Sequence, residues 1–175
     1  YDRLSQINGN DPKFSEWYYG PQKRLLTSYS FKSENKKKYR DNIRFVAAYQ
    51  NIEESRHNRR FQSENINRRT EKLDIYSLNI DLSKKIQSHT IRYGIEGLYN
   101  IVKSSAYSEN ISSGETSNLD TRYPDGGSNV QSAAIYLTHS KKSENEKFIF
   151  SDGIRFSRTQ LESKFIDKTF FPFLD

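Results

Sequence analysis

Side chains alternate between apolar and polar along much of this sequence, and this period of two constrains the fold more than any other feature. Around residue 94, Tyr93 and Ile95 would occupy one face of a strand while Arg92 and Glu96 occupy the other. Successive side chains of a β-strand point to opposite faces of its sheet, and no segment has the spacing of an amphipathic helix. The pattern predicts strands over residues 24–31, 42–50, 73–82, 91–101, 133–140 and 147–158.

The connectors between these segments alternate in length. The short, charged ones span 32–41, 83–89 and 140–147, and the longer ones span 4–22, 52–70, 103–129 and the residues from 161 onward. In an up-and-down meander this alternation sends long loops to one end and short turns to the other, as in outer-membrane β-barrels. We therefore expect an all-β, antiparallel up-and-down meander of about six to seven strands, forming part of a transmembrane β-barrel.

The composition agrees with a sheet that has one apolar face. Only 33% of residues are hydrophobic and the mean hydropathy is −0.95, but 14% are aromatic, which argues against disorder. In a barrel wall only alternate residues need to be apolar, so low hydropathy is expected. The net charge of +6 arises from 28 basic and 22 acidic residues mixed along the chain, which favours a solvated surface over a nucleic-acid partner.

Candidate chemistry beyond binding is sparse. The chain has no cysteine, and His57, His89 and His139 fall on different segments without close partners in sequence, so we expect no metal site. Asp120 and Asp125 are too few for a calcium loop, and the YPDGG motif around Asp125 predicts a turn. No nucleophile motif or glycine-rich phosphate loop is present. We therefore expect neither an enzyme nor a cofactor.

One aromatic cluster precedes a Gly-Pro turn. Trp17, Tyr18 and Tyr19 stand directly before Gly20 and Pro21. Trp and Tyr prefer the membrane–water interface, so this cluster could belong to an aromatic girdle where a loop enters a strand. A core cluster beside a turn in a soluble protein is an equally good interpretation.

A second cluster is basic. The stretch at 52–70, as one loop or as a strand extension, would gather arginine side chains whose guanidinium groups can bind carboxylates or phosphates in a bidentate manner. An anionic ligand such as a carboxylate siderophore or haem, or lipopolysaccharide phosphate, would suit it. The alternative is a solvated run balanced by Glu53, Glu54 and Glu64. The candidate ligand-binding residues are Arg56, His57, Arg59, Arg60, Arg68 and Arg69.

The period of two also selects a polar face. If the apolar face of each strand meets lipid, the other face lines a lumen. The lumen candidates are Arg44, Gln50, Ser77, Asn79, Arg92, Glu96, Asn100 and Arg155.

Several phrases of the sequence resemble the barrel of TonB-dependent outer-membrane receptors of the Bacteroidetes type. They occur in the expected order: YDRL (1–4), WYYGPQKRLLTSYS (17–30), FVAAYQNIEESRHNRRF (45–61), YSLNIDLSK (76–84), RYGIEGLYN (92–100), DTRYPDGGS (120–128) and LESKFIDKTFFPF (161–173). The resemblance implies a barrel of about 22 strands with an N-terminal plug. Such receptors take up scarce nutrients such as ferric siderophores, haem or cobalamin.

The resemblance also implies partners and a location. Residues 1–175 would be a single partial barrel segment without plug domain or signal peptide, in the outer membrane of a Gram-negative cell. Its partners would be outer-membrane lipid, a small iron chelate or similar ligand, and a periplasmic TonB-type coupling protein acting through the missing plug. The alternative is a soluble all-β module that binds glycan or another polyanion through Tyr18, Tyr19 and the arginines. A basic nucleic-acid binder is the third hypothesis, which lacks any known module signature.

Overall fold

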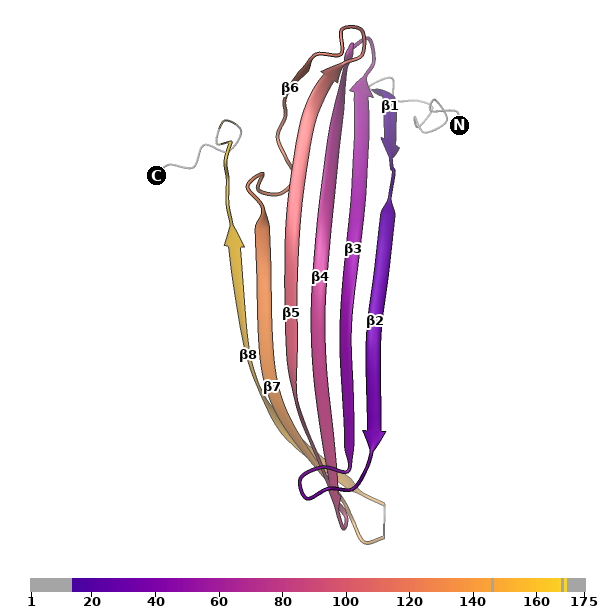
Figure 1. The fold of residues 1–175 in the computed structure, drawn as a ribbon, viewed down its shortest axis with the longest axis vertical. Helices are drawn as coiled ribbons and strands as arrows, with labels where there is room; N and C mark the ends of the chain where they lie inside the picture. Colours follow the sequence, from indigo (N-terminus) through magenta and orange to yellow (C-terminus); the bar gives the residue numbers. More distant parts are fainter. Residues whose placement is uncertain (1–13, 146, 168, 170–175) are drawn as a thin grey trace.

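The computed structural model describes residues 14–145, 147–167 and 169. In this part of the chain all regular structure is one antiparallel β-sheet, and the chain runs up and down it (Figure 1). The strands are β1 (Phe14–Tyr19), β2 (Lys23–Glu34), β3 (Asn42–Arg60), β4 (Asn65–Ile86), β5 (His89–Asn110), β6 (Thr116–Asn118), β7 (Ser128–Lys142) and β8 (Ile149–Ser163). The all-β, antiparallel up-and-down fold expected from the sequence is confirmed. The sheet is an open section that does not close on itself.

The strands β1 and β2 are two sections of one line along the same edge of the sheet. Both pair with β3, β1 near its C-terminal end and β2 along the rest. The break falls at Gly20 and Pro21, where Gly20 has a φ of +115°, a conformation that requires glycine. The amide of Gly20 donates to the carbonyl of Ser55 at 2.9 Å, so the broken line stays attached to β3.

The connector expected at 52–70 is mostly strand, and that part of the prediction is wrong. β3 and β4 pair without interruption from Asn42 opposite Ser83 to Arg59 opposite Ile66. Only residues 61–64 form the turn between them. Both faces carry polar side chains here, so the apolar alternation that signals a strand is lost. The backbone ladder does not need that alternation, because its hydrogen bonds join main-chain groups.

The connectors still differ between the two ends of the sheet. Residues 35–41, 87–88 and 143–148 lie at the lower end of Figure 1, and residues 61–64 and 111–127 lie at the upper end. Within the described residues only 111–127 is long. The predicted connector at 4–22 lies partly outside those residues, as do the YDRL phrase and the end of the phrase at 161–173.

The register separates the side chains into two faces. Directly opposed residues share a face, and one apolar row crosses the whole sheet. This row contains Phe31, Phe45, Ile80, Ile95, Ile135 and Phe156. We call the face that carries it the apolar face and the opposite one the polar face.

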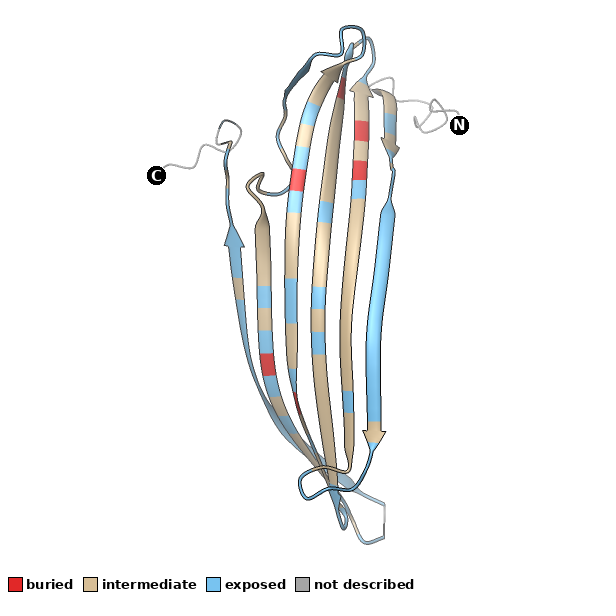
Figure 2. Ribbon diagram, in the orientation of Figure 1, coloured by how far each residue is buried: buried red, intermediate tan, exposed pale blue. Residues whose placement is uncertain are grey.

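Neither face is covered by a second layer in the described part of the chain. Ile66 and Ala134 are the only buried hydrophobic residues there, and Figure 2 shows almost no buried positions. Large side chains of the apolar row remain exposed, with Phe156 at 62% and Ile135 at 57%. Burial of such area drives folding, so this face requires a hydrophobic partner.

A carboxylate clamp joins the connector before β7 to the segment after β8. The Asp125 carboxylate accepts hydrogen bonds from the backbone N–H groups of Ile166 and Asp167, each at 2.8 Å. These N–H groups lower the pKa of Asp125 below its ordinary value. Because the folded pKa is depressed, the clamp is present above the ordinary carboxyl pKa and is lost as pH falls through the lowered value.

We expect Asp125→Asn to loosen this junction, because an amide has one acceptor oxygen where the carboxylate has two. Amide exchange at Ile166 and Asp167 should accelerate roughly tenfold at neutral pH, because local opening frees both N–H groups more often. The exposed Glu115→Gln substitution, in the same connector, is the control and should leave both amides unchanged. Unaltered exchange in Asp125→Asn would show that the clamp does not hold the segment.

Candidate functional site on the polar face

The polar face contains all the side chains predicted to line a lumen. One row of the register joins Arg44, Asp81, Gly94, Tyr136 and Arg155 across β3, β4, β5, β7 and β8. The other predicted residues occupy positions an even number of residues away on these strands and therefore share the face. They are Gln50, Ser77, Asn79, Arg92, Glu96 and Asn100.

A hydrogen bond spans three strands near the middle of this face. The Tyr136 hydroxyl on β7 donates to Asp81 Oδ1 on β4 at 2.5 Å, so its ring crosses β5. The ring passes over Gly94. A Cβ at that position would lie 2.8 Å from both the Tyr136 Cε1 and its hydroxyl oxygen, and 2.3 Å from the Ile80 carbonyl oxygen. Gly94 is therefore required for the close approach of Tyr136.

An ion pair lies beside this hydrogen bond. Arg155 Nη2 on β8 contacts Glu96 Oε2 on β5 at 2.6 Å, reaching across β7. Ala134 on β7 is directly opposite Glu96, and its small side chain leaves room for the arginine. Both charged side chains are partly exposed, at 49% and 39%. Exposed pairs contribute little stability, so these groups are available for polar contacts with another molecule.

Two shallow hollows adjoin the ion pair. One of 300 Å³ is lined by Ser77, Asn79, Glu96 and Arg155 among others, and one of 320 Å³ includes Tyr136 and Thr138. The structure thus brings together Ser77, Asn79, Glu96 and Arg155 from the predicted set. Arg44, Gln50, Arg92 and Asn100 share the face but do not line these hollows.

The sequence prediction missed Asp81, Gly94 and Tyr136. Asp81 and Gly94 both occur in segments with alternating side chains. Only the register across β4, β5 and β7 reveals that Tyr136 passes over Gly94 and contacts Asp81. A glycine within a strand indicates a bulge or a close approach, and that signal was available.

The basic cluster does not form one cationic loop. Arg56 is opposite Arg69 on one face, whereas His57 is opposite Arg68 on the other, and Arg60 is the last residue of β3. Three of the arginines are paired with acids from other segments. The pairs are Arg59–Glu16 at 3.1 Å, Arg68–Glu109 at 2.6 Å and Arg69–Asp120 at 2.7 Å. These are different acids from Glu53, Glu54 and Glu64 considered in the sequence analysis.

The aromatic cluster in β1 lies beside residues 56–58 of β3, far along that strand from the apolar row. Trp17 and Tyr19 contact each other on the polar side, and Tyr18 stacks on His57 at 4.8 Å on the apolar side. The expectation that all three share a girdle is wrong, because alternation in β1 divides them between faces. A row of tyrosines borders the apolar residues instead. It contains Tyr49, Tyr76 and Tyr99, with ring centroids 5.0 Å and 6.5 Å apart.

Two histidines that have no close partner in sequence are in contact in the fold. His89 Nδ1 and His139 Nε2 lie 2.9 Å apart, and His139 Nδ1 is 2.9 Å from Asp152 Oδ1. The antiparallel pairing of β5, β7 and β8 brings together residues that are distant in sequence. Within the described residues no group of three or more histidine or acidic side chains could hold a metal ion.

No protein-family model matches the chain, and no curated protein matches it either.

In the part of the chain that the structure describes, no helix is long and apolar enough to cross a membrane.

Proposed function

We propose that this chain is a section of the wall of a TonB-dependent outer-membrane receptor. Such a receptor transports a scarce nutrient, for example a ferric siderophore, haem or cobalamin. The observation that carries the proposal is a single-layer sheet of long antiparallel strands with an uncovered apolar band on one face and a polar opposite face. Its partners would be lipid, the nutrient and a periplasmic coupling protein that acts through a plug.

The extent of the apolar band supports a membrane location. On β5 the apolar-face positions from Ile91 to Ile101 are apolar or glycine. Ten steps along a strand cover about 33 Å, or about 25 Å across a bilayer at a tilt of about 40°. That is the height of the lipid-facing band in outer-membrane barrels. The tyrosine row crosses this band close to its Ile101 end, near the interface where aromatic residues are enriched.

The alternative is a soluble all-β module for glycan or another polyanion. It would bury the apolar face against a second sheet. The described residues contain no such sheet, and the basic residues that would bind the polyanion are divided between two faces and largely paired with acids. These observations favour the receptor.

The polar face would then contact the nutrient or the plug. Glu96, Arg155 and Tyr136 offer a carboxylate, a guanidinium and a hydroxyl within one continuous surface. Groups of both signs can orient a polar ligand or a second protein surface through charge-assisted hydrogen bonds.

We expect Arg155→Met in the full-length receptor to slow uptake about fivefold, because the polar face loses its guanidinium donor. Arg158→Met is a matched control, because Arg158 lies on the same strand but on the apolar face. It should leave uptake unchanged, and both variants should be present in the membrane at the wild-type level. Equal effects of the two substitutions would contradict the assignment of the polar face to transport.

The proposal as a whole is tested in the source cell. An antibody raised against this chain should detect a polypeptide far larger than 20.6 kDa in the detergent-extracted outer membrane. Deletion of its gene should abolish uptake of one nutrient. A soluble band near 20.6 kDa would exclude the receptor and direct attention to glycan and polyanion binding.

A further inference from the structure

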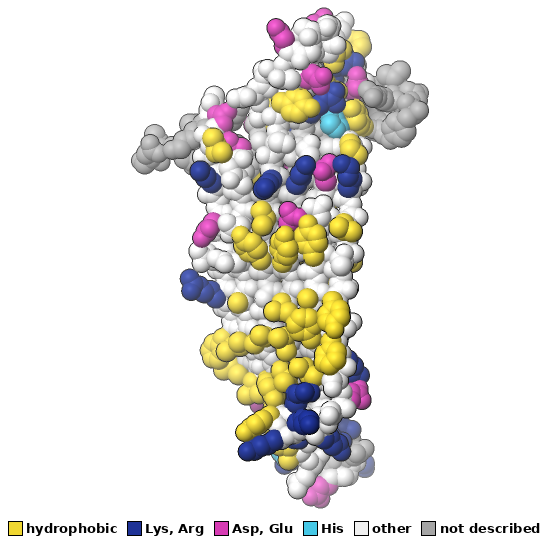
Figure 3. Space-filling model, in the orientation of Figure 1, with side chains coloured by type: hydrophobic (Ala, Val, Ile, Leu, Met, Phe, Trp, Pro, Cys, Tyr) yellow, Lys and Arg dark blue, Asp and Glu magenta, His cyan; other side chains and the backbone are white. Residues whose placement is uncertain are grey.

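A row of lysines crosses the apolar face above the tyrosines. Lys23 is opposite Glu53, Glu53 is opposite Lys72, and Lys72 is opposite Lys103. Lys164 continues the row beyond Gly127, since its backbone exchanges hydrogen bonds with Gly126 and Gly127. Figure 3 shows a line of blue basic side chains with acidic magenta among them, above a band of yellow hydrophobic side chains. We call Lys23, Lys72, Lys103 and Lys164 the lysine row.

Two members of the lysine row share one carboxylate. Glu53 contacts Lys23 at 3.1 Å and Lys72 at 3.3 Å, and both lysines remain exposed at 65% and 56%. Lys103 and Lys164 are exposed and make no ion pair within the described residues.

The nearby acids are already engaged by other donors. The Asp125 carboxylate accepts two backbone N–H groups, and Glu162 accepts from Asn129 and Gln160. Asp74 accepts from Tyr49 and Asn51. These acids keep their charge, so the lysine row offers ammonium donors and not a net positive charge. Within the described residues Lys103 and Lys164 contact no carboxylate as an ion pair.

The height of the lysine row matches a lipid headgroup. Lys72 and Lys103 each lie four residues along their strand from Tyr76 and Tyr99, which is about 13 Å of strand or about 10 Å across a tilted bilayer. The headgroup layer begins at the interfacial aromatic residues and is several ångströms deep. Lysine side chains can extend along apolar surface and place their ammonium groups there.

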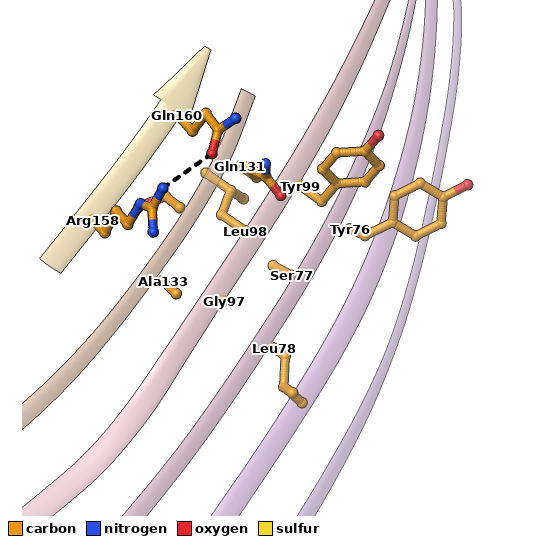
Figure 4. Close-up of a pocket in the computed structure, with 11 residues that line it drawn as sticks. Tyr76, Ser77, Leu78, Gly97, Leu98, Tyr99, Gln131, Ala133, Arg158 and Gln160 are labelled. Carbon is orange, nitrogen blue, oxygen red and sulfur yellow. Dashed lines mark hydrogen bonds between the residues drawn. The ribbon is translucent and has the colours of Figure 1, made fainter. Parts of the chain in front are cut away.

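Two hollows on the apolar face provide space for such a lipid. A hollow of 630 Å³ lies between Lys103 and Lys164 and has Tyr99, Ile101 and Ile166 in its lining. Next to it, a second hollow of 550 Å³ has the side chains of Leu78, Tyr76 and Tyr99 at one side, with Gly97 and Ala133 adding almost no bulk (Figure 4). Tyr99 belongs to both linings. An acyl chain can follow this path while its headgroup remains beside the lysines.

We propose that the lysine row binds the phosphate of an anionic membrane lipid in the leaflet nearest residues 61–64 and 111–127. The inference rests on the proposed function, because it requires the apolar face to meet a bilayer. It adds to that function a specific lipid site on the outer wall. Each lysine near an anionic surface contributes about fivefold to binding.

The test uses the full-length protein in detergent and the variant Lys103→Gln/Lys164→Gln. Native mass spectrometry measures retention of phosphatidylglycerol, with phosphatidylcholine as the zwitterionic reference. We expect the wild type to prefer phosphatidylglycerol and the variant, which lacks two lysines, to bind it about 25-fold more weakly. Arg24→Gln/Lys85→Gln removes the same charge from the polar face and should retain the wild-type preference.

Three results would overturn the lipid site. The first is an equal loss of phosphatidylglycerol binding in both double variants, which would indicate a general charge effect. The second is no lipid preference in a wild-type protein that is otherwise extracted as an integral membrane protein. The third is binding of inorganic phosphate at the lysine row by a wild-type protein that retains no lipid. A wild-type protein that never enters membranes would instead refute the proposed function, and the lipid site with it.

Discussion

Replacing Ile95 with lysine is expected to prevent stable insertion of the full-length protein into the outer membrane. Ile95 lies in the centre of the apolar row, opposite Ile80 on one side and Ile135 on the other, and is 45% exposed. A lysine on the lipid face near the bilayer midplane costs about 2–4 kcal/mol. That is a large share of the stability of about 5–15 kcal/mol that is typical of folded proteins.

The measurement is the amount of folded protein in the outer membrane, read from resistance to unfolding in unheated detergent. Leu98→Lys provides the control, since Leu98 lies on the same strand, is 39% exposed and belongs to the polar face. It should reach nearly the wild-type level. If the two lysine variants behave alike, the faces do not differ in their surroundings and the apolar face does not meet lipid.

Substitution of Gly94 by alanine is expected to have the second large effect. Alanine in place of a strand glycine ordinarily stabilises by reducing the freedom of the unfolded chain. At Gly94 the added Cβ would lie 2.3 Å from the Ile80 carbonyl oxygen and 2.8 Å from the Tyr136 ring. To relieve these two close contacts, both the backbone at Ile80 and the side chain of Tyr136 must move. We therefore expect a loss of about 1–3 kcal/mol in unfolding free energy.

Denaturant titration of the full-length protein measures this loss, and Gly97→Ala is the matched control. A Cβ at Gly97 meets only Leu78 Cβ at 4.0 Å, an ordinary contact, so that variant should equal or exceed the wild type. Adding Tyr136→Ala to Gly94→Ala should recover only part of the loss, because the Ile80 oxygen remains in the way. Full recovery would show that contact with the Tyr136 side chain alone causes the loss of stability in Gly94→Ala.

The alternation of side chains is sufficient to predict the apolar sections of β2, β3, β4, β5, β7 and β8 and their two faces. All the predicted lumen residues, from Arg44 to Arg155, lie on the same face of the sheet. Along a continuously paired strand every second side chain points to the same face, so the sequence position is enough to assign it. The segments beyond the apolar band were misread as loops. Residues around Arg56 and Arg69 are paired strand, but both faces are polar there, so no period of two in hydropathy remains.

Contacts between distant strands could not be predicted from the sequence. Tyr136 meets Asp81 and Arg155 meets Glu96 across an intervening strand, so each contact depends on two registers at once. His89 and His139 lie on the adjacent strands β5 and β7, so their contact depends on the register of that one pair. The lysine row is also set by register, because its members are separated by dozens of residues in sequence and are aligned only by pairing.

The most direct test of the central claim is a cysteine scan along β5. The chain contains no cysteine, so single substitutions from Ile91 to Ile101 introduce one reporter each in this segment. In the full-length protein in a bilayer, a fluorophore at each position is exposed to nitroxide-labelled lipid. The account predicts quenching at odd positions such as Ile95 and Tyr99, and little at even positions such as Glu96 and Leu98. Equal quenching at odd and even positions, or none at either, would contradict it.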